Sequence, residues 1–195
     1  MIGTALLASA GGDRVKVVLG LEPVFPEARA LGRALTVRSA GADSLAVHHA
    51  VTVAQPGDVI VLAVGGERSV AHCGELVVRA ARLRGVAGIV VDGAIRDRAE
   101  IALLGFPVFH LGTSPRGPGK AGPGALRVPV ELGGVQVEPG DLICADADGV
   151  AVVAAAHADQ VRAAAEALEE RERGMVSRIE SGESTVEILG LKELS

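Results

Sequence analysis

The sequence predicts an α/β protein in which a β-rich layer accompanies a largely parallel sheet. Over the first two thirds of the chain, short apolar runs alternate with helical patterns, which is typical of parallel strands joined by helices. From Val128 onward, period-2 alternation and turn residues indicate hairpins instead. The 195 residues suit one domain with a sizeable core, expected over residues 1–157, followed by a helix and tail over residues 158–195.

The strands expected in the first part are short apolar runs, most of them rich in β-branched residues. They are Val15–Leu21, Ala34–Val37, Val59–Val64, Ile89–Val91 and Pro107–Leu111. Helices are expected at Ser44–Ala54, Glu75–Arg84 and Asp97–Leu104, where apolar residues recur at helical spacing. Gly85 stands where a glycine would end the second of these helices.

The second part is predicted to form hairpins and then a long helix. Val128–Leu132 and Val135–Val137 alternate on either side of two glycines, as in a hairpin. Asp159–Ile179 is predicted to be helical, with a seam that faces a core or a partner. The seam consists of Val161, Ala165, Leu168, Glu172, Met175 and Ile179. Glu172 either reaches into a neighbouring site or lies in a solvated, frayed helix end near Gly174.

Composition argues against several function classes. The formal net charge is −5 and the only aromatic residues are three phenylalanines, whereas nucleic-acid binding needs a basic groove and exposed rings. No apolar run has the length of a membrane span, and the apolar N-terminal stretch is too short for a secretory leader. Cys73 and Cys144 suit buried thiols in a reducing compartment. We therefore expect a cytoplasmic protein with no nucleic-acid or membrane partner.

The chemically richest stretch is Gly88–Glu100, where a buried strand runs into a turn that carries Asp92, Arg96, Asp97 and Glu100. Strands of α/β sheets place functional groups just past their C-terminal ends. An arginine beside a carboxylate offers a fork for a substrate carboxylate and an oxygen ligand for Mg²⁺ or Mn²⁺. The same pattern also suits an ordinary helix start, because acidic residues favour a first helical turn.

An anion-binding element is expected at the same edge of the sheet. Gly74 precedes the helix that begins at Glu75, and a glycine there lets backbone N–H groups approach an anion. Arg96 follows after the helix and the next strand have returned to that edge. These groups together suit a small 2-oxo acid. Residues 112–124 are predicted to form a mobile, Gly/Pro-rich surface loop suited to act as a lid.

Several segments of the chain resemble the 4-hydroxy-4-methyl-2-oxoglutarate aldolases, a family that also contains the regulators of ribonuclease E activity. The segments are Gly74–Val77, Gly85–Glu100, Gly105–Phe109, Ser114–Lys120, Val128–Val130, Val137–Asp141 and Asp146–Val150. The resemblance covers roughly residues 27–180 and is degenerate over Gly3–Gly12. It implies a three-layer β/β/α swivelling-domain fold, a homotrimer or hexamer with sites at subunit interfaces, and class II aldolase chemistry.

The resemblance also implies a role for each residue of the predicted site. Asp97 would hold a divalent metal ion, Mg or Mn, and Arg96 would bind the 2-oxo acid. Glu75 and Glu100 would lie near water on that metal, and Glu172 is the candidate for a C-terminal glutamate that the family supplies from the adjacent subunit. The backbone groups expected to hold the pyruvoyl carboxylate are those of Gly74, Glu75, Leu76 and Val77.

Two functions from different classes follow. The first is a lyase that cleaves 4-hydroxy-4-methyl-2-oxoglutarate or 4-carboxy-4-hydroxy-2-oxoadipate to pyruvate and a second 2-oxo acid, with oxaloacetate decarboxylation as a related reaction. A Schiff-base route is disfavoured, because it needs a desolvated lysine, while Lys120 lies in the Gly/Pro-rich loop and Lys192 in the tail. The second is a non-catalytic regulator that binds and inhibits a ribonuclease E-type enzyme. The loop Ser114–Lys120 and Glu100 favour the enzyme.

Overall fold

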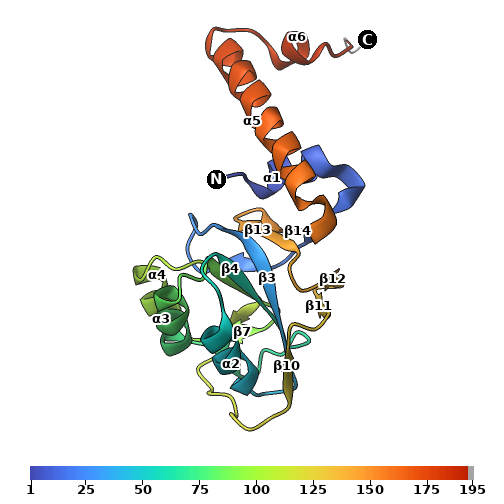
Figure 1. Cartoon of the computed structure of the whole chain (residues 1–195). Helices are drawn as coiled ribbons and strands as arrows, with labels where there is room; N and C mark the ends of the chain where they lie inside the picture. Colours follow the sequence, from blue (N-terminus) through green and yellow to red (C-terminus); the bar gives the residue numbers. More distant parts are fainter. Residues whose placement is uncertain (193–195) are drawn as a thin grey trace.

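A computed structural model describes residues 1–192 of the chain, and its centre is a nine-stranded mixed sheet (Figure 1). Four strands run parallel in the middle of the sheet: β3 (Ala30–Ser39), β4 (Asp58–Ala63), β6 (Gly88–Val91) and β8 (Val108–His110). Each contains or overlaps one of the predicted apolar runs. Their parallel pairing follows from the helices that connect them, which confirms the α/β prediction.

Antiparallel strands complete the sheet on both sides. β13 (Leu142–Asp146) and β14 (Gly149–Val153) form a hairpin that pairs with β3, and β1 (Val15–Val18) pairs with β14. At the opposite edge, β2 (Glu22–Pro23) pairs with β8. β10 (Gly124–Leu126) pairs with the last residues of β3.

Helices cover one face of this sheet and a hairpin covers the other. The helices are α2 (Leu45–Val53), α3 (Glu75–Leu83) and α4 (Arg98–Leu103), all three within the predicted ranges. Their apolar residues share one core cluster with alternate residues of β4 and β6. The intervening sheet residues pack against the hairpin of β11 (Val130–Leu132) and β12 (Val135–Val137). The three-layer β/β/α architecture is therefore confirmed.

A small parallel sheet lies just past the carboxyl ends of the central strands. β5 (Ala71–Cys73), β7 (Ala94–Ile95) and β9 (Gly112–Thr113) follow β4, β6 and β8 along the chain and pair in the same order. None of the three was predicted, because segments this short, with no hairpin turn between them, show no recognisable pattern. The small sheet carries the turn that contains Arg96 and Asp97 of the predicted site.

The N-terminal helix packs against the first turns of the long C-terminal helix, beside the antiparallel strands of the main sheet. α1 (Thr4–Gly11), a helix that was not predicted, lies against α5 (Ala158–Glu180) and shares a third core cluster with it. Thr4 fastens α1, because its N–H and its hydroxyl both donate to the buried carboxylate of Asp146. The same cluster includes residues of β13 and β14, so α1 and the first turns of α5 are packed against the main sheet (Figure 1).

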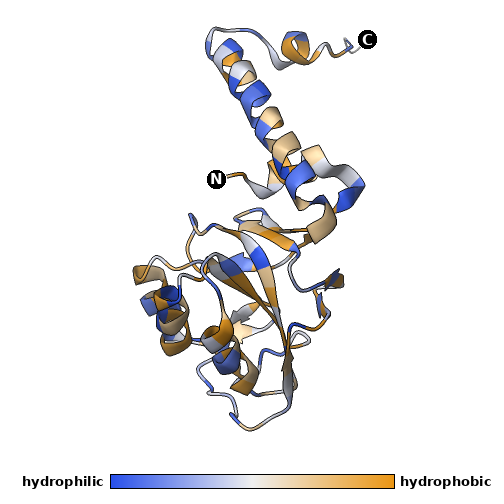
Figure 2. Ribbon diagram, in the orientation of Figure 1, coloured by the Kyte–Doolittle hydropathy of each residue, from blue (hydrophilic) through white to orange (hydrophobic). Residues whose placement is uncertain are grey.

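α5 leaves the body of the molecule after its first turns (Figure 1). Val161 and Ala165 of the predicted seam are buried, whereas Glu172 and Ile179 are exposed. Figure 2 shows apolar residues concentrated on the main sheet and mixed with polar residues along α5. Residues 193–195 of the predicted C-terminal tail lie outside the described residues.

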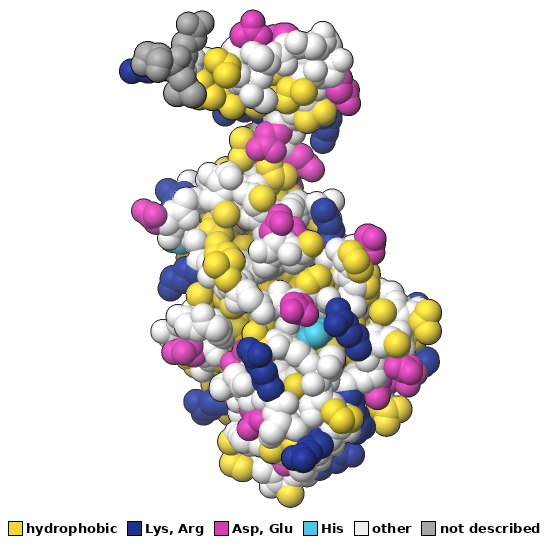
Figure 3. All heavy atoms as spheres, turned by 180° about the vertical axis from the view of Figure 1, so that it is seen from behind, with side chains coloured by type: hydrophobic (Ala, Val, Ile, Leu, Met, Phe, Trp, Pro, Cys, Tyr) yellow, Lys and Arg dark blue, Asp and Glu magenta, His cyan; other side chains and the backbone are white. Residues whose placement is uncertain are grey.

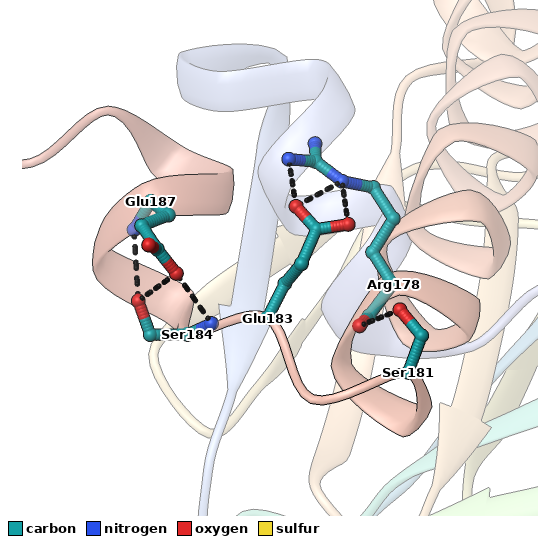
Figure 4. A network of polar contacts seen from close by, with 5 residues as sticks. All are labelled: Arg178, Ser181, Glu183, Ser184 and Glu187. Atoms are coloured by element: carbon teal, nitrogen blue, oxygen red, sulfur yellow. Dashed lines mark hydrogen bonds and ion pairs between the residues drawn. The ribbon is translucent and has the colours of Figure 1, made fainter.

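A polar network orders the chain after α5 and leads into α6 (Thr185–Leu189) (Figure 4). Arg178 donates to both carboxylate oxygens of Glu183, and Ser184 and Glu187 form a reciprocal capping box at the start of α6. Exposed ion pairs of this kind contribute little to stability, so the network sets the direction of the chain rather than its stability.

Apolar side chains also reach the surface. Seen from behind, they form patches among charges of both signs (Figure 3). Leu76, Leu83 and Leu103 are each at least 75% exposed on the helices that surround the small sheet. Within residues 1–192 no helix is both long and apolar enough to cross a bilayer.

Candidate active site at the small sheet

The turn between β7 and α4 has a strained backbone at Asp97. This residue adopts the left-handed conformation, with φ 57° and ψ 38°, although it is not glycine. Such a conformation costs on the order of 1 kcal/mol for a residue with a side chain and is concentrated at functional sites. Asp97 is the N-cap residue of α4, yet its side chain does not cap that helix. The carboxylate is directed to another helix instead.

That other helix is α3, whose N-terminus begins at Gly74. The backbone N–H of Glu75 donates to Oδ2 of Asp97 at 3.0 Å, and the Nε of Arg96 lies 3.6 Å from the same oxygen. The N–H of Arg96 donates to the carbonyl of Cys73, which links the two segments. The predicted convergence of the α3 N-terminus with Arg96 and Asp97 is therefore present in the structure.

Gly74 is needed here for space and not for backbone freedom. Its φ of −149° is an extended conformation that any residue adopts. A Cβ atom at this position would lie 2.7 Å from Oδ2 of Asp97 and 3.0 Å from Cγ of Arg96. Only a glycine allows the carboxylate and the guanidinium to approach the start of α3 this closely.

Arg96 is half-buried and lines two hollows in the surface. The first is a narrow cavity of about 50 Å³, enough for a few water-sized groups. It is lined by Arg96 and by residues of α2 and its N-cap, β5, α3 with its N-cap, and the Gly/Pro-rich loop: Ser44, His48, Ala71, His72, Cys73, Gly74, Leu76, Val77, Pro118 and Lys120. The second is an open groove lined by Arg96, Asp97, Arg98, Ala99, Glu100, Thr113, Ser114 and Pro115.

The two hollows divide the predicted site residues between them. Gly74, Leu76 and Val77 line the cavity, Asp97 and Glu100 line the groove, and Arg96 belongs to both. These residues are brought together as the sequence predicted.

Two of the predicted glutamates have other surroundings. The carboxylate of Glu75 forms an ion pair with Arg79, one helical turn later, at 2.6 Å. Glu172 is exposed on α5, which leaves the body of the molecule, and it does not line the cavity or the groove of its own chain. A role for Glu172 in the site of an adjacent subunit stays a prediction.

Asp97 is the residue best suited to hold a divalent metal ion. Its side chain is 38% exposed at the edge of the groove, which Glu100 also lines. Within residues 1–192, no three His, Cys, Asp or Glu side chains are grouped so that they could bind a metal ion together. An ion at Asp97 would therefore take most of its ligands from water and substrate. Mg²⁺ accepts such a site, because it often retains several waters beside one or two carboxylates.

Asp92 has a structural role although it belongs to the same motif. It is buried, and its two carboxylate oxygens accept hydrogen bonds from the backbone N–H groups of Val64 and Gly65, just after β4. Burial raises the pKa of this carboxyl above its ordinary value. Asp92 therefore holds the turn after β4 and does not contribute to the groove.

The two cysteine thiols are unreactive. Cys73 and Cys144 are buried and unpaired, as the sequence predicted. Burial raises the pKa of each thiol to about 12, so both remain protonated at neutral pH. Since the thiolate is the reactive form of cysteine, neither residue is suited to act as a nucleophile.

Asp43 is a residue near the site that sequence reasoning missed. It is buried just before α2, and its carboxylate accepts backbone hydrogen bonds from Leu45, Ala121 and Gly122. The two partners in the Gly/Pro-rich loop are more than 75 residues away in sequence, so no local pattern reveals them. The part of the loop nearest Lys120 is thus held by hydrogen bonds to the start of α2 and is not a mobile lid.

Comparison with known proteins gives the family. The family model described as Aldolase/RraA matches residues 6–152, which is most of the chain. The chain belongs to the RraA-like family. This confirms the resemblance seen in the sequence, and it extends the match to α1, where the resemblance was degenerate.

Individual relatives carry different names. A protein of Halalkalibacterium halodurans named "Putative 4-hydroxy-4-methyl-2-oxoglutarate aldolase" is 41% identical over 152 residues, 78% of this chain and 72% of that protein. A Geobacillus kaustophilus structure titled as an S-adenosylmethionine: 2-dimethylmenaquinone methyltransferase is 36% identical, with a TM-score of 0.75 over 78% of this chain and 95% of that one.

A third relative represents the regulators. The Streptomyces coelicolor structure of RraAS2, titled as an unusual member of the RNase ES inhibitor RraA protein family, is 31% identical with a TM-score of 0.77. The match covers 91% of both chains. Because the names of similar proteins differ this much, the function has to be argued from the site.

Proposed function

We propose that this protein is a divalent-metal-dependent aldolase that releases pyruvate from 4-hydroxy-4-methyl-2-oxoglutarate or 4-carboxy-4-hydroxy-2-oxoadipate. The observation that carries the proposal is the convergence of the Asp97 carboxylate, the Arg96 guanidinium and the N-terminus of α3 around Gly74. The aldolase name of the relative from Halalkalibacterium halodurans supports the same reaction class.

Different residues of the site bind different groups of the substrate. The N–H of Glu75 is used by Asp97, but the N–H groups of Leu76 and Val77 and the positive dipole end of α3 suit the carboxylate of the pyruvoyl group. Arg96 donates to the 2-oxo oxygen and stabilises the negative charge that grows there as the bond breaks. A divalent ion held by Asp97 would supply Lewis-acid polarisation of the same carbonyl group.

The reaction is a retro-aldol cleavage. A base removes the proton of the C4 hydroxyl, the C3–C4 bond breaks, and its electron pair moves toward the 2-oxo group, giving the enolate of pyruvate and a second 2-oxo acid. Proton return to C3 then yields pyruvate. Glu100 lines the groove and is the candidate base in this chain, acting through a water. Glu172 of an adjacent subunit is the other candidate.

Oxaloacetate fits the same electron flow. Loss of CO₂ from its C4 carboxylate leaves the same pyruvate enolate, so one site serves both reactions. Oxaloacetate decarboxylation is therefore a convenient first assay of the proposed site.

We further propose that the chain acts as a homotrimer or hexamer in the cytoplasm. The support is the exposure of Leu76, Leu83 and Leu103 on α3 and α4, and of Ile179 on the projecting α5. A subunit interface would remove these side chains from water. Light scattering at micromolar concentration is expected to give a mass that is a multiple of three chains, and a monomer would contradict this assembly.

A second candidate function is inhibition of a ribonuclease E-type enzyme. It rests on the similarity to the Streptomyces coelicolor structure over nine tenths of both chains. This function would need no metal ion and no Asp97 carboxylate, so removal of either would distinguish it from the aldolase function.

Pyruvate release distinguishes the two. The purified protein is incubated with oxaloacetate or 4-hydroxy-4-methyl-2-oxoglutarate, with Mg²⁺ or Mn²⁺, and then with a chelator. The aldolase proposal predicts release that the chelator abolishes. Absence of release with both metals, together with inhibition of ribonuclease E cleavage of an RNA substrate, would overturn it in favour of the regulator.

A further inference from the structure

We propose that Lys120 binds a second carboxylate of the substrate, and that Asp43 positions Lys120 by fixing the loop segment on which it lies. This inference rests on the proposed aldolase function and names the charge that its substrates must carry. It follows from the hydrogen bonds on either side of Lys120 and from the side chains that line the cavity beside Arg96.

Asp43 fastens the residues that follow Lys120. Its Oδ2 accepts hydrogen bonds from the N–H groups of Ala121 at 2.9 Å and Gly122 at 2.8 Å, while Oδ1 accepts from Leu45 at 2.8 Å. These backbone bonds, led by the one from Leu45, hold the pKa of the Asp43 carboxyl below its ordinary value. A Cβ at Gly122 would lie 2.8 Å from Cγ of Asp43, so the loop can approach this closely only as glycine.

The residue that precedes Lys120 is fastened as well. The N–H of Ser44 donates to the carbonyl of Gly119 at 2.9 Å, its hydroxyl donates to the same oxygen, and the N–H of Gly119 donates to Ala42. Both neighbours of Lys120 are thus bound to the segment that leads into α2. An exposed lysine that served only solubility would not need its backbone fixed from both sides.

The fixed backbone places Lys120 at the cavity beside Arg96. Lys120 is exposed and lines this cavity, so it stands at the mouth. His48 of α2 also lines the cavity. Burial, followed by the charge of Lys120, lowers the pKa of the His48 imidazole. His48 is therefore neutral at pH 7, and the permanent positive charges of the cavity are those of Arg96 and Lys120.

The number of carboxylates on the substrate, compared with the number of cationic groups in the cavity, indicates which substrates the site prefers. The proposed substrates carry at least two carboxylates, one on the pyruvoyl part and at least one on the part beyond the bond that breaks. The α3 N-terminus and Arg96 are used by the first. Lys120 is the remaining permanent cation on the cavity lining. A carboxylate that reaches the mouth gains a charge-assisted hydrogen bond there. A substrate with a single carboxylate gains nothing from Lys120.

The test compares substrates and a small set of variants. Lys120→Met removes the ammonium group and keeps the length of the side chain. We expect it to raise KM for oxaloacetate about tenfold and to change kcat less than twofold. A tenfold rise is at the lower end of the range for the loss of a hydrogen bond to a charged group, because the site is open to solvent. The inhibition constant of pyruvate, which has one carboxylate, should stay within twofold of wild type. Lys120→Arg should restore most of the loss, and Lys16→Met, an exposed lysine on the distant β1, is the matched control.

Asp43→Asn tests the positioning role. It should raise KM for oxaloacetate by a similar factor, and adding Lys120→Met to it should give little further rise, because both changes remove one interaction. Asp13→Asn, an exposed aspartate, is the control. Should Asp43→Asn fail to fold, Ser44→Ala loosens the same segment more gently and should raise KM about twofold.

The outcomes separate this inference from the function on which it rests. If wild type releases pyruvate and Lys120→Met leaves KM for oxaloacetate unchanged, the inference is wrong and the aldolase proposal stands. If each single variant raises KM about tenfold and the double variant raises it by the product of the two factors, the two residues act independently. That result would refute the positioning role of Asp43 and leave the role of Lys120 in place. If wild type neither turns over oxaloacetate nor binds pyruvate, the proposed function itself fails.

Discussion

Gly74→Ala probes the geometry of the site with one methyl group. The new Cβ would lie 2.7 Å from Oδ2 of Asp97, whereas ordinary van der Waals contact begins near 3.4 Å. The carboxylate must therefore retreat by about 0.7 Å. Its hydrogen bond from the N–H of Glu75, now 3.0 Å, would then stretch beyond 3.5 Å and be lost. Arg96, 3.0 Å from the new atom at Cγ, must move as well.

The expected effect on stability is small. Loss of one hydrogen bond at a partly exposed site costs about 1 kcal/mol. Replacing glycine by alanine at an extended backbone position recovers part of this, about 0.4–1 kcal/mol, by restricting the unfolded chain. The expected effect on activity is larger, because a displacement of about 1 Å in a catalytic group can cost on the order of 100-fold. We expect kcat/KM for oxaloacetate to fall between about 10- and 100-fold, with the melting temperature nearly unchanged.

The assay is metal-dependent pyruvate release, measured beside a thermal unfolding curve. Gly174→Ala is the matched control, because nothing lies within 4 Å of a Cβ at that position and alanine favours the helix. It should keep full activity and equal or greater stability. Wild-type activity in Gly74→Ala would show that the contact between Asp97 and the start of α3 is not needed for the reaction.

Three further predictions concern other parts of the account. Arg96→Lys should lose most activity with Mg²⁺ while its unfolding curve stays as in wild type, because a point charge cannot reproduce the planar fork of a guanidinium; near-native turnover would refute the assignment. Asp92→Asn should destabilise the protein by about 1–3 kcal/mol in urea unfolding, because its amide NH₂ would face a backbone donor; an unchanged midpoint would contradict its bracing role. Glu172→Gln and Asp97→Ala subunits, each inactive alone, should recover some activity when they are mixed and shown to exchange, if Glu172 acts across an interface. No recovery would mean that Glu172 is only a solvated residue of α5.

A fifth prediction concerns pH. Because its folded-state pKa lies below the ordinary value of 3.8, ionised Asp43 stabilises the fold fully at pH values above that value. This stabilisation is lost as the pH falls through the lower folded-state pKa. The difference in unfolding free energy between wild type and Asp43→Asn should therefore shrink as the pH is lowered from 5 toward 3. A difference that stays constant over this range would contradict the ionised carboxylate as the group that holds the loop.

The elements predicted correctly carry a recognisable pattern over several residues. β4 and β6 are continuous buried apolar runs, and α3 has one apolar face and ends before Gly85, whose φ of 73° is the left-handed cap that the sequence indicated. The strands of the small sheet were missed because two or three residues, with no hairpin turn between them, form no such pattern. α1 was missed because its Ala/Leu-rich sequence has no polar face to mark a helix.

The same distinction holds for the site. Arg96 and Asp97 were found because they stand together after a strand, where α/β proteins place functional groups. Asp43 could not be found, because its role depends on Ala121 and Gly122, which only the folded chain brings to it. Glu172 shows a third case: its place on the seam is visible in the sequence, but its function depends on a second chain.

The most direct test of the central claim is Mn²⁺ binding followed by electron paramagnetic resonance in the presence of pyruvate. We expect wild type to bind Mn²⁺, pyruvate to tighten this binding, and Asp97→Ala to lose both effects while keeping the wild-type circular dichroism spectrum. Asp13→Ala, an exposed aspartate away from the groove, should bind as wild type does. Mn²⁺ binding by Asp97→Ala with wild-type affinity and wild-type response to pyruvate would contradict the assignment of the metal to Asp97, and with it the proposed site.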